Sequence, residues 1–156
     1  MKAKISRGGG FRGAVAYVHG KGDAQKVGGN MSGTTPQELV REFGITKKLR
    51  PDCKNPVWHC SLALPKGDRL SAEKWDELST DFMMEMGMDP ANFLYDVRRH
   101  SDTDHDHIHI LASRIGLDGQ LWHGQNDVFR AIEATHKLEQ RHHLTLTPGF
   151  DLDVEK

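Results

Sequence analysis

Four histidines lie within one short segment of the chain, at His100, His105, His107 and His109. On a β-strand, alternate side chains point to the same face, so His107 and His109 would lie together while the isoleucines that follow them enter the core. If the preceding strand turns back through residues 101–105, His100 arrives beside His107. Three imidazoles in one place can hold a divalent metal ion and leave positions open for water or a phosphate oxygen.

An acidic loop that contains Asp102 precedes the alternating histidines. We expect Asp102 to accept a hydrogen bond from a ring N–H of a metal-binding histidine, which is the usual support for such a ligand. Neutral imidazoles suit Mn²⁺, Co²⁺, Ni²⁺ or Zn²⁺ better than Mg²⁺, which prefers oxygen ligands. Mg²⁺ would still serve if phosphate and water filled the other positions. The sequence therefore predicts a divalent metal site held by His100, His107 and His109.

The chain has two tyrosines, each a source of a nucleophilic phenol oxygen. Tyr17 stands near the end of an expected short helix, 11–19, whose apolar residues recur at helical spacing. Tyr95 alternates with Phe93 and Val97 in an expected strand, which indicates packing. Taken by itself, Tyr17 is better explained as a helix-packing aromatic residue than as a catalytic group.

Hydrophobic spacing and turn residues predict the elements that must position these side chains. Strands are expected at residues 2–6, 56–64, 93–100, 107–115 and 121–123. Helices are expected at 11–19, 35–48, 71–86 and 127–142, the last with Val128, Ala131, Ile132, Thr135 and Leu138 facing inward. The polar, glycine-rich residues 20–34 indicate a long loop. The order of elements predicts an α+β fold: a central antiparallel sheet with the His-x-His strand in its middle and helices packed on one face.

Charge is divided unevenly along the 156 residues. The formal net charge is −1, yet residues 1–54 hold 11 basic and 4 acidic residues, a net of +7, and residues 55–156 hold 10 basic and 18 acidic residues, a net of −8. Such asymmetry indicates a face that binds a polyanion. In the basic part, the candidates for this face are Lys4, Arg7, Arg12, Lys21 and Lys26, and Arg98 joins them from the strand that leads into His100.

Length and composition fit one domain, which we expect to span residues 1–150, with 151–156 as a C-terminal tail or the start of a longer protein. No apolar stretch is long enough to span a membrane, and no secretory signal is recognisable. Cys53 and Cys60 do not make a disulfide framework, so we expect a cytoplasmic protein. On the strand 56–64, His59 and Cys60 point to opposite faces, and packing is the expected role of both.

The histidine segment resembles the third motif of plasmid conjugative relaxases. The likeness rests on the run His100-x-Asp102-Thr103-Asp104-His105-x-His107-Ile108-His109-Ile110. These relaxases are MOBP-type mobilisation proteins, single-tyrosine endonucleases of the His-hydrophobic-His (HUH) superfamily. The resemblance covers about residues 3–149 and includes the strand-helix-strand order that precedes the motif.

The resemblance implies a nucleophilic tyrosine on a helix near the N-terminus, and Tyr17 matches that first motif. It implies that Tyr17, His100 and Asp102 form the catalytic group, that the cofactor is Mn²⁺ or Mg²⁺, and that cleavage leaves a 5′-phosphotyrosine and a free 3′-OH. The implied substrate is single-stranded or supercoiled plasmid DNA at an origin of transfer. Accessory relaxosome proteins and a type IV coupling protein are the implied partners, and the bacterial protein would reach the recipient cell bound to DNA.

One motif departs from the family, and three alternative functions stay open. The family's second motif commonly has a serine on the strand 56–64, where our alignment has Ala63 with Ser61 nearby. Replication initiators and transposases of the superfamily have their tyrosine after the histidines, and none follows Tyr95 here. HIT nucleotide hydrolases have a similar histidine run, but Asp106 replaces an apolar residue. A metal-dependent DNA-binding autorepressor without nicking activity would need the same metal site.

Overall fold

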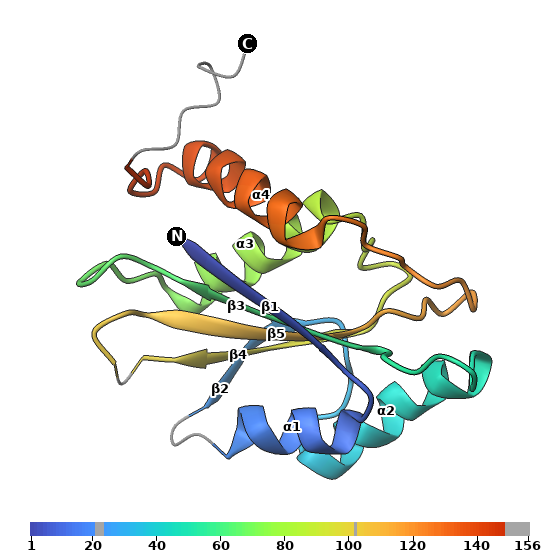
Figure 1. Cartoon of the computed structure of the whole chain (residues 1–156). Helices are drawn as coiled ribbons and strands as arrows, with labels where there is room; N and C mark the ends of the chain where they lie inside the picture. Colours follow the sequence, from blue (N-terminus) through green and yellow to red (C-terminus); the bar gives the residue numbers. More distant parts are fainter. Residues whose placement is uncertain (21–23, 102, 149–156) are drawn as a thin grey trace.

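The computed structural model of the chain describes residues 1–20, 24–101 and 103–148. Lys21, Asp102 and the expected tail 151–156 lie outside the described residues. The described chain has an α+β fold, a five-stranded antiparallel sheet with four helices (Figure 1). This is the fold class that the sequence predicts.

The strands are β1 (Lys2–Gly8), β2 (Gln25–Gly29), β3 (Val57–Ala63), β4 (Tyr95–His100) and β5 (His107–Ser113). Their order in the described sheet is β1-β3-β5-β4-β2, and each neighbouring pair is antiparallel. The His-x-His strand, β5, therefore lies in the middle, as predicted. β3 pairs with one of its edges and β4 with the other, so residues from three strands can meet on one face.

The prediction of an uninterrupted loop at 20–34 is wrong, because β2 lies within it. Val27 is the only apolar residue of this strand, and a bulge interrupts its pairing with β4. Pairing with a neighbouring strand, rather than local preference, decides the structure here. The short strand expected at 121–123 is reduced to a single bridge between Leu121 and Ile115.

The helices are α1 (Phe11–His19), α2 (Pro36–Leu49), α3 (Ala72–Glu85) and α4 (Asp127–Arg141). α3 and α4 lie on one side of the sheet, whereas α1 and α2 lie on the other (Figure 1). The prediction that all helices pack on one face is therefore wrong for α1 and α2. An apolar stripe shows that one side of a helix is buried, but it does not tell which face of the sheet covers it.

Alternation along β5 divides its side chains between two apolar cores. Ile108 and Ile110 enter the larger core, together with Phe82 of α3 and residues of α4. Leu111 enters a smaller core with Phe11 and other residues of α1 and α2. The smaller core occupies only one end of its face of the sheet. The histidines of β5 lie on that same face, toward the other end.

Two helices begin at the capping residues that the sequence predicts. The Thr35 hydroxyl accepts a hydrogen bond from the Glu38 N–H, and the Glu38 carboxylate accepts one from the Thr35 N–H, at 3.2 Å and 3.0 Å. Pro36 is the first helical residue of α2, where its missing N–H costs nothing. The Ser71 hydroxyl accepts from the Lys74 N–H at 3.1 Å at the start of α3.

The inward face of α4 is only partly as predicted. Ala131, Thr135 and Leu138 are buried, but Val128 and Ile132 are 58% and 41% exposed. α4 packs against β1 and α3. At about 100° per residue, Val128 and Ile132 lie at one edge of the apolar stripe, beyond Ala131 and Leu138, and this edge stays exposed.

Candidate active site

The structure brings together the three histidines that the sequence assigns to a metal site. His100 of β4 is paired directly with His107 of β5. The ring centroids are 5.3 Å apart for His100 and His107, 4.9 Å for His100 and His109, and 5.2 Å for His107 and His109. The hairpin between β4 and β5 therefore produces the convergence expected from the strand pattern.

The register of the sheet extends this site across β3 and β1. Residues that are directly opposite in an antiparallel pair share a face. One row across the sheet consists of Lys4, Ser61, His109 and Arg98, and the next consists of Lys2, Ala63, His107 and His100. Ser61 and Ala63, the two candidates for the second motif, therefore both lie on the histidine face.

Hydrogen bonds limit which ring nitrogens can bind a metal ion. His107 Nδ1 lies 2.9 Å from the His105 carbonyl oxygen, which can only accept. His107 Nδ1 must therefore carry the proton, and the lone pair of this neutral ring is on Nε2. His109 Nδ1 lies 2.8 Å from Nε2 of His59, a bond in which either nitrogen can be the donor. His107 and His109 thus both have Nδ1 in a hydrogen bond to another group.

The residues present fit a divalent transition-metal ion by their donor chemistry. Three imidazoles from two adjacent strands are the ligands that such ions favour, and they leave positions for oxygen donors. In the described part of the chain, no group of three His, Cys, Asp or Glu side chains has its donor atoms arranged to hold an ion without adjustment. The rings are neighbours that side-chain rotation would have to turn toward a common point.

Tyr17 lies in the same groove as His107 and His109, whereas His100 is buried behind them and does not line it. The groove has a volume of about 1570 Å³, and its walls include the histidine face of β3 and β5, the edge strand β1 and the end of α1. Tyr17 is 53% exposed, and its ring meets His59 edge-on at a centroid distance of 6.1 Å. The buried residues of α1 are Phe11, Val15 and Val18, so Tyr17 falls off the packed stripe. The prediction of a packing role, made for Tyr17 alone, does not hold.

Tyr95 occupies the opposite face of the sheet. It is 2% exposed in the larger core, and its hydroxyl is 3.0 Å from that of Thr80 on α3. Burial raises the pKa of Tyr95, although the Thr80 hydrogen bond acts against this effect. A residue so placed packs the core, as predicted, and has no access to the groove.

His59 is the site residue that the sequence prediction missed. Cys60 does point to the other face and is buried, and that burial raises the pKa of its thiol. His59 is half-buried, however, and contacts both Tyr17 and His109. Strand alternation puts His59 and Ser61 on one side of β3, which was the only signal in the sequence. The sequence could not tell which side this would be until β3 was paired with β5.

Asp106 ends the acidic loop and is fully buried. Its carboxylate accepts hydrogen bonds from Arg99 Nε at 3.0 Å and Nη2 at 2.9 Å, and from Trp75 Nε1 and the Leu70 N–H, both at 3.1 Å. Burial by itself raises the pKa of Asp106, but these four hydrogen bonds outweigh it, and the net pKa is lowered. Asp106 therefore stays ionised and fastens the start of β5, which holds His107, to α3 and β4.

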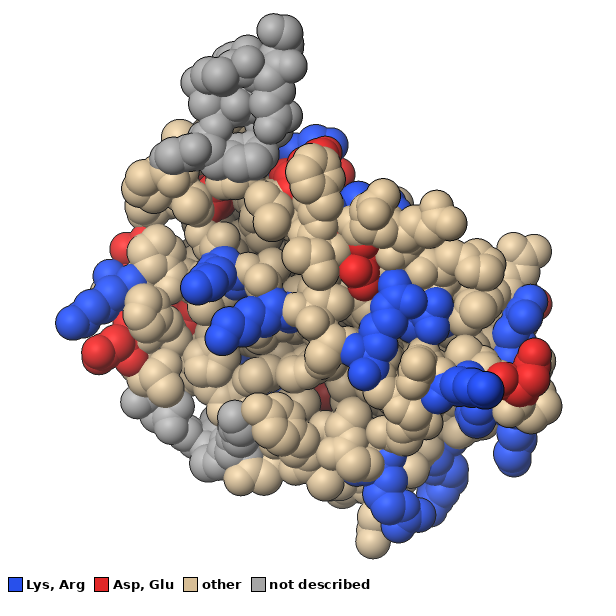
Figure 2. All heavy atoms as spheres, viewed as in Figure 1, with Lys and Arg blue, Asp and Glu red and all other residues tan. Residues whose placement is uncertain are grey.

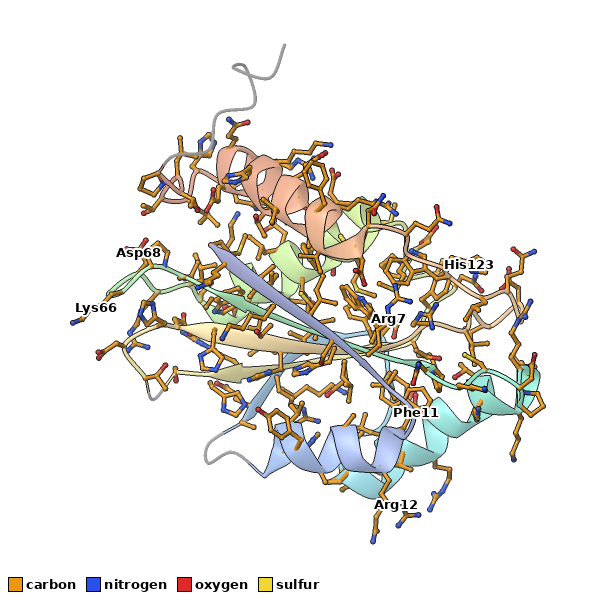
Figure 3. All side chains as sticks on the ribbon, viewed as in Figure 1. Arg7, Phe11, Arg12, Lys66, Asp68 and His123 are labelled. Carbon is orange, nitrogen blue, oxygen red and sulfur yellow. The ribbon has the colours of Figure 1, made fainter. Side chains whose placement is uncertain are left out.

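The six residues expected to bind nucleic acid differ in their surroundings. Lys4 is exposed on the histidine face of β1 and borders the groove. Arg12 is exposed but points away from the sheet, on the outer side of α1 (Figure 3). Lys21 lies outside the described residues. Figure 2 shows that Lys and Arg side chains prevail over Asp and Glu on the face of the molecule that carries β1 and α1.

The other three basic residues are engaged within the chain. Arg7 donates to the Asp127 carboxylate at 3.1 Å and to the His123 carbonyl at 3.0 Å, at the end of the sheet away from Lys66 (Figure 3). Arg98 is 7% exposed and donates to Asp96 at 2.9 Å. The Lys26 ammonium is 3.4 Å from the same Asp96. The structure therefore uses these cations to hold its own segments together.

The antiparallel sheet gathers histidines from two neighbouring strands beside an exposed tyrosine, the arrangement that the resemblance to His-hydrophobic-His nucleases implies. Residues 16–144 match the family model described as relaxase, MobA/VirD2-like, nuclease domain. The chain belongs to this family, whose members are DNA-nicking enzymes of plasmid mobilisation. No curated protein and no solved structure matches the chain.

Membership of this family implies a DNA substrate. The match begins within α1 and includes Tyr17 and all the histidines of the groove. Among the described residues, none of the helices has the length and apolar character that a membrane crossing requires.

Proposed function

We propose that this relaxase domain nicks one strand of plasmid DNA at an origin of transfer, with Tyr17 as the nucleophile. The observation that carries the proposal is that Tyr17, His107 and His109 border a single groove. A groove of this kind can hold a single strand with its scissile phosphate between the phenol and the imidazoles. The proposed domain comprises residues 1–150.

The reaction is a transesterification, in which one phosphodiester is exchanged for another. The Tyr17 phenol oxygen attacks the scissile phosphorus, the bond from phosphorus to the 3′ oxygen breaks, and the released 3′ oxygen takes up the proton that the phenol gives up. The products are a 5′-phosphotyrosine and a free 3′-OH. Reversal of the same step reseals the strand without ATP, because the phosphotyrosine ester conserves the phosphodiester bond.

His100, His107 and His109 would hold the divalent ion, which we propose to be Mn²⁺ or Mg²⁺, with Zn²⁺, Ni²⁺ or Co²⁺ able to replace it in vitro. Bound there, the ion would supply Lewis-acid polarisation of a non-bridging phosphate oxygen and stabilisation of the charge that develops on the phosphoryl group. The hydrogen bond from His107 Nδ1 to the His105 carbonyl supports this role, because it keeps the Nε2 lone pair available. Asp102 is the further proposed support of this group.

Lys4 is the proposed phosphate-binding residue best supported by its position, since it lies in the row of Ser61 and His109. Lys2, in the neighbouring row, extends the same cationic edge. Arg12 would bind DNA outside the groove, and Lys21 is a further proposed DNA-binding residue. Arg7, Lys26 and Arg98 each have a carboxylate of the chain as a partner, which would compete with a phosphate for them.

The proposed partners are those of conjugative transfer. They are plasmid DNA at the origin of transfer, accessory relaxosome proteins and a type IV coupling protein. The proposed place of action is the bacterial cytoplasm, from which the protein passes to the recipient cell bound to DNA. The support for these partners is membership of the relaxase family alone.

A single experiment tests the proposed chemistry. The protein is incubated with Mn²⁺ and single-stranded oligonucleotides that carry candidate origin nick sites, and covalent adducts are resolved by denaturing electrophoresis. We expect an adduct for the wild type and the Tyr95→Phe variant and none for Tyr17→Phe. An adduct that survives in Tyr17→Phe would refute the assignment of the nucleophile. Absence of any adduct with all origin sequences, together with hydrolysis of adenosine nucleotides, would favour a nucleotide hydrolase instead.

A further inference from the structure

We infer that His59 is a positioning residue that fixes the ring orientation and tautomer of His109, and so prepares it as a metal ligand. This inference rests on the proposed function, because it concerns one of the proposed ligands. The role is distinct from metal binding itself, since His59 acts through His109.

The geometry between the two rings is that of a directed hydrogen bond. His59 Nε2 and His109 Nδ1 are 2.8 Å apart, and the rings are nearly parallel, with centroids 5.1 Å apart and an interplanar angle of 23°. The two residues come from adjacent strands, with Ser61 of β3 directly opposite His109. The sheet register therefore sets the separation of the rings, and no loop has to be ordered to form the bond.

Two proton arrangements satisfy this bond, and only one of them suits a ligand. If His59 donates from Nε2, the neutral His109 ring carries its proton on Nε2 and has its only lone pair occupied. If His109 donates from Nδ1, its Nε2 lone pair remains available for an ion. His107 has the second arrangement, imposed by the His105 carbonyl. We assign the same arrangement to His109, with His59 as the acceptor that takes the place of a carbonyl oxygen.

His59 also connects the proposed ligand with the proposed nucleophile. The Tyr17 ring meets His59 edge-on, with an interplanar angle of 71°, on the side of β3 that faces the groove. One half-buried side chain thus contacts both groups that must act on the same phosphate. Its loss would loosen His109 and remove a wall against which Tyr17 packs.

The direct test uses the metal-free protein and nuclear magnetic resonance of its imidazole nitrogens at pH 8. In the wild type we expect His109 to be protonated on Nδ1. The His59→Leu variant removes the acceptor, and we expect a mixture of the two His109 tautomers. The His59→Gln variant supplies an amide oxygen as acceptor, and we expect the Nδ1–H form to return. A wild-type His109 protonated on Nε2, or a tautomer unchanged in His59→Leu, would overturn the inference.

Calorimetric titration with Mn²⁺ measures the consequence for the ligand. Loss of a hydrogen-bond partner of a metal-bound histidine weakens metal binding about 10- to 100-fold, which we expect for His59→Leu, with His59→Gln within a few-fold of the wild type. His123→Ala is the matched control, since His123 is exposed at the other end of the sheet, and we expect no change. Equal affinity of wild type and His59→Leu would overturn the inference. A wild type that binds no Mn²⁺ would instead refute the proposed metal site, and the tautomer experiment would still decide the role of His59.

Discussion

The two faces of the sheet are made from the same strands but have opposite compositions. On the face under α3 and α4, the alternate residues of β3 and β5 are apolar and buried, as are Tyr95 and Val97 of β4, and the Tyr95 hydroxyl has Thr80 as its partner. On the other face, α1 and α2 enclose a small core at one end, and imidazoles, Ser61 and Lys4 border an open groove at the other. A strand periodicity of two lets one β-strand supply both faces.

This difference separates stability from chemistry within single strands. In β5, Ile108 and Ile110 stabilise the fold while the histidines on either side of Ile108 remain available for reaction. A substitution on the apolar face should therefore change unfolding, and one on the groove face should change binding or cleavage. The four predictions below test this separation in order of decreasing expected effect.

The two tyrosines provide the sharpest comparison. Tyr17→Phe should reduce cleavage by at least about 10³-fold, because the nucleophile is removed, while stability changes by less than about 0.5 kcal/mol at this exposed site. Tyr95→Phe should cost about 1 kcal/mol of stability through the lost hydrogen bond and leave cleavage within a few-fold. Oligonucleotide cleavage rates and urea unfolding measure the two effects. Similar cleavage defects in both variants would refute the assignment of cleavage to the groove face alone.

Truncation of one side chain on each face extends the comparison to packing. Phe82→Ala should destabilise the protein by about 3–5 kcal/mol, because a buried aromatic ring is replaced by a cavity. His107→Ala should abolish Mn²⁺ binding and cleavage but cost less than about 1 kcal/mol of stability, since its ring lies at the groove. Urea unfolding is measured beside metal titration. Retention of full Mn²⁺ affinity in His107→Ala would show that the ligands have been wrongly assigned.

Two aspartates of the acidic loop contrast a buried with an exposed carboxylate. Asp106→Ala should cost about 3 kcal/mol, because it removes a fully buried carboxylate and leaves the partly buried Arg99 guanidinium without its partner. The exposed Asp104, 3.9 Å from Lys66, should tolerate alanine within about 0.5 kcal/mol. Because the pKa of Asp106 is lowered by folding, its contribution is complete above the ordinary value of 3.8 and is lost as the pH falls through the lowered value. The difference between wild type and Asp106→Ala should thus be constant from pH 6 to 8 and shrink in acid, as unfolding curves at several pH values would reveal.

The smallest expected effect concerns the start of α2, beneath the smaller core. Hydrogen bonds from the backbone N–H groups of Thr35 and Thr34 and from the Thr35 hydroxyl lower the pKa of Glu38 to about 2, from an ordinary 4.5. Thr35→Ala should cost about 1 kcal/mol and raise the pKa of Glu38 toward 4.5, as a carboxyl titration by nuclear magnetic resonance would measure. The stabilisation by ionised Glu38 is complete above pH 4.5 and is lost as the pH falls through about 2. Ser71→Ala, which removes the cap of α3, should leave the pKa of Glu38 unchanged.

Local patterns in the sequence were sufficient for the four helices, for four of the five strands and for the central histidines. Thr35 and Ser71 marked the starts of two helices because their side chains satisfy N–H groups of their own first turn. His107 and His109 share a face because of strand alternation, and a short hairpin was enough to bring His100 beside them. Each of these interactions joins residues that are close in the sequence, so their spacing carries the information.

Contacts between distant segments could not be read in the same way. β2 is a strand because β4 offers it an edge, and its own composition resembles that of a loop. His59 meets His109 across 50 residues, and no feature of either segment specifies that register. Lys26 and Arg98 looked like surface cations until the fold brought both of them to Asp96.

The sequence by itself determined the fold class, the central strand with its paired histidines and the two-sided character of that strand, since these depend on local periodicity. Only the tertiary structure decided that α1 and α2 lie on the histidine face and that Tyr17 is exposed to the groove. It also decided that His59 contacts both Tyr17 and His109. The physical reason is that alternation shows that a strand has two faces but does not tell which of them helices will cover. That is decided only when the strands pair in register and the helices pack on one side or the other.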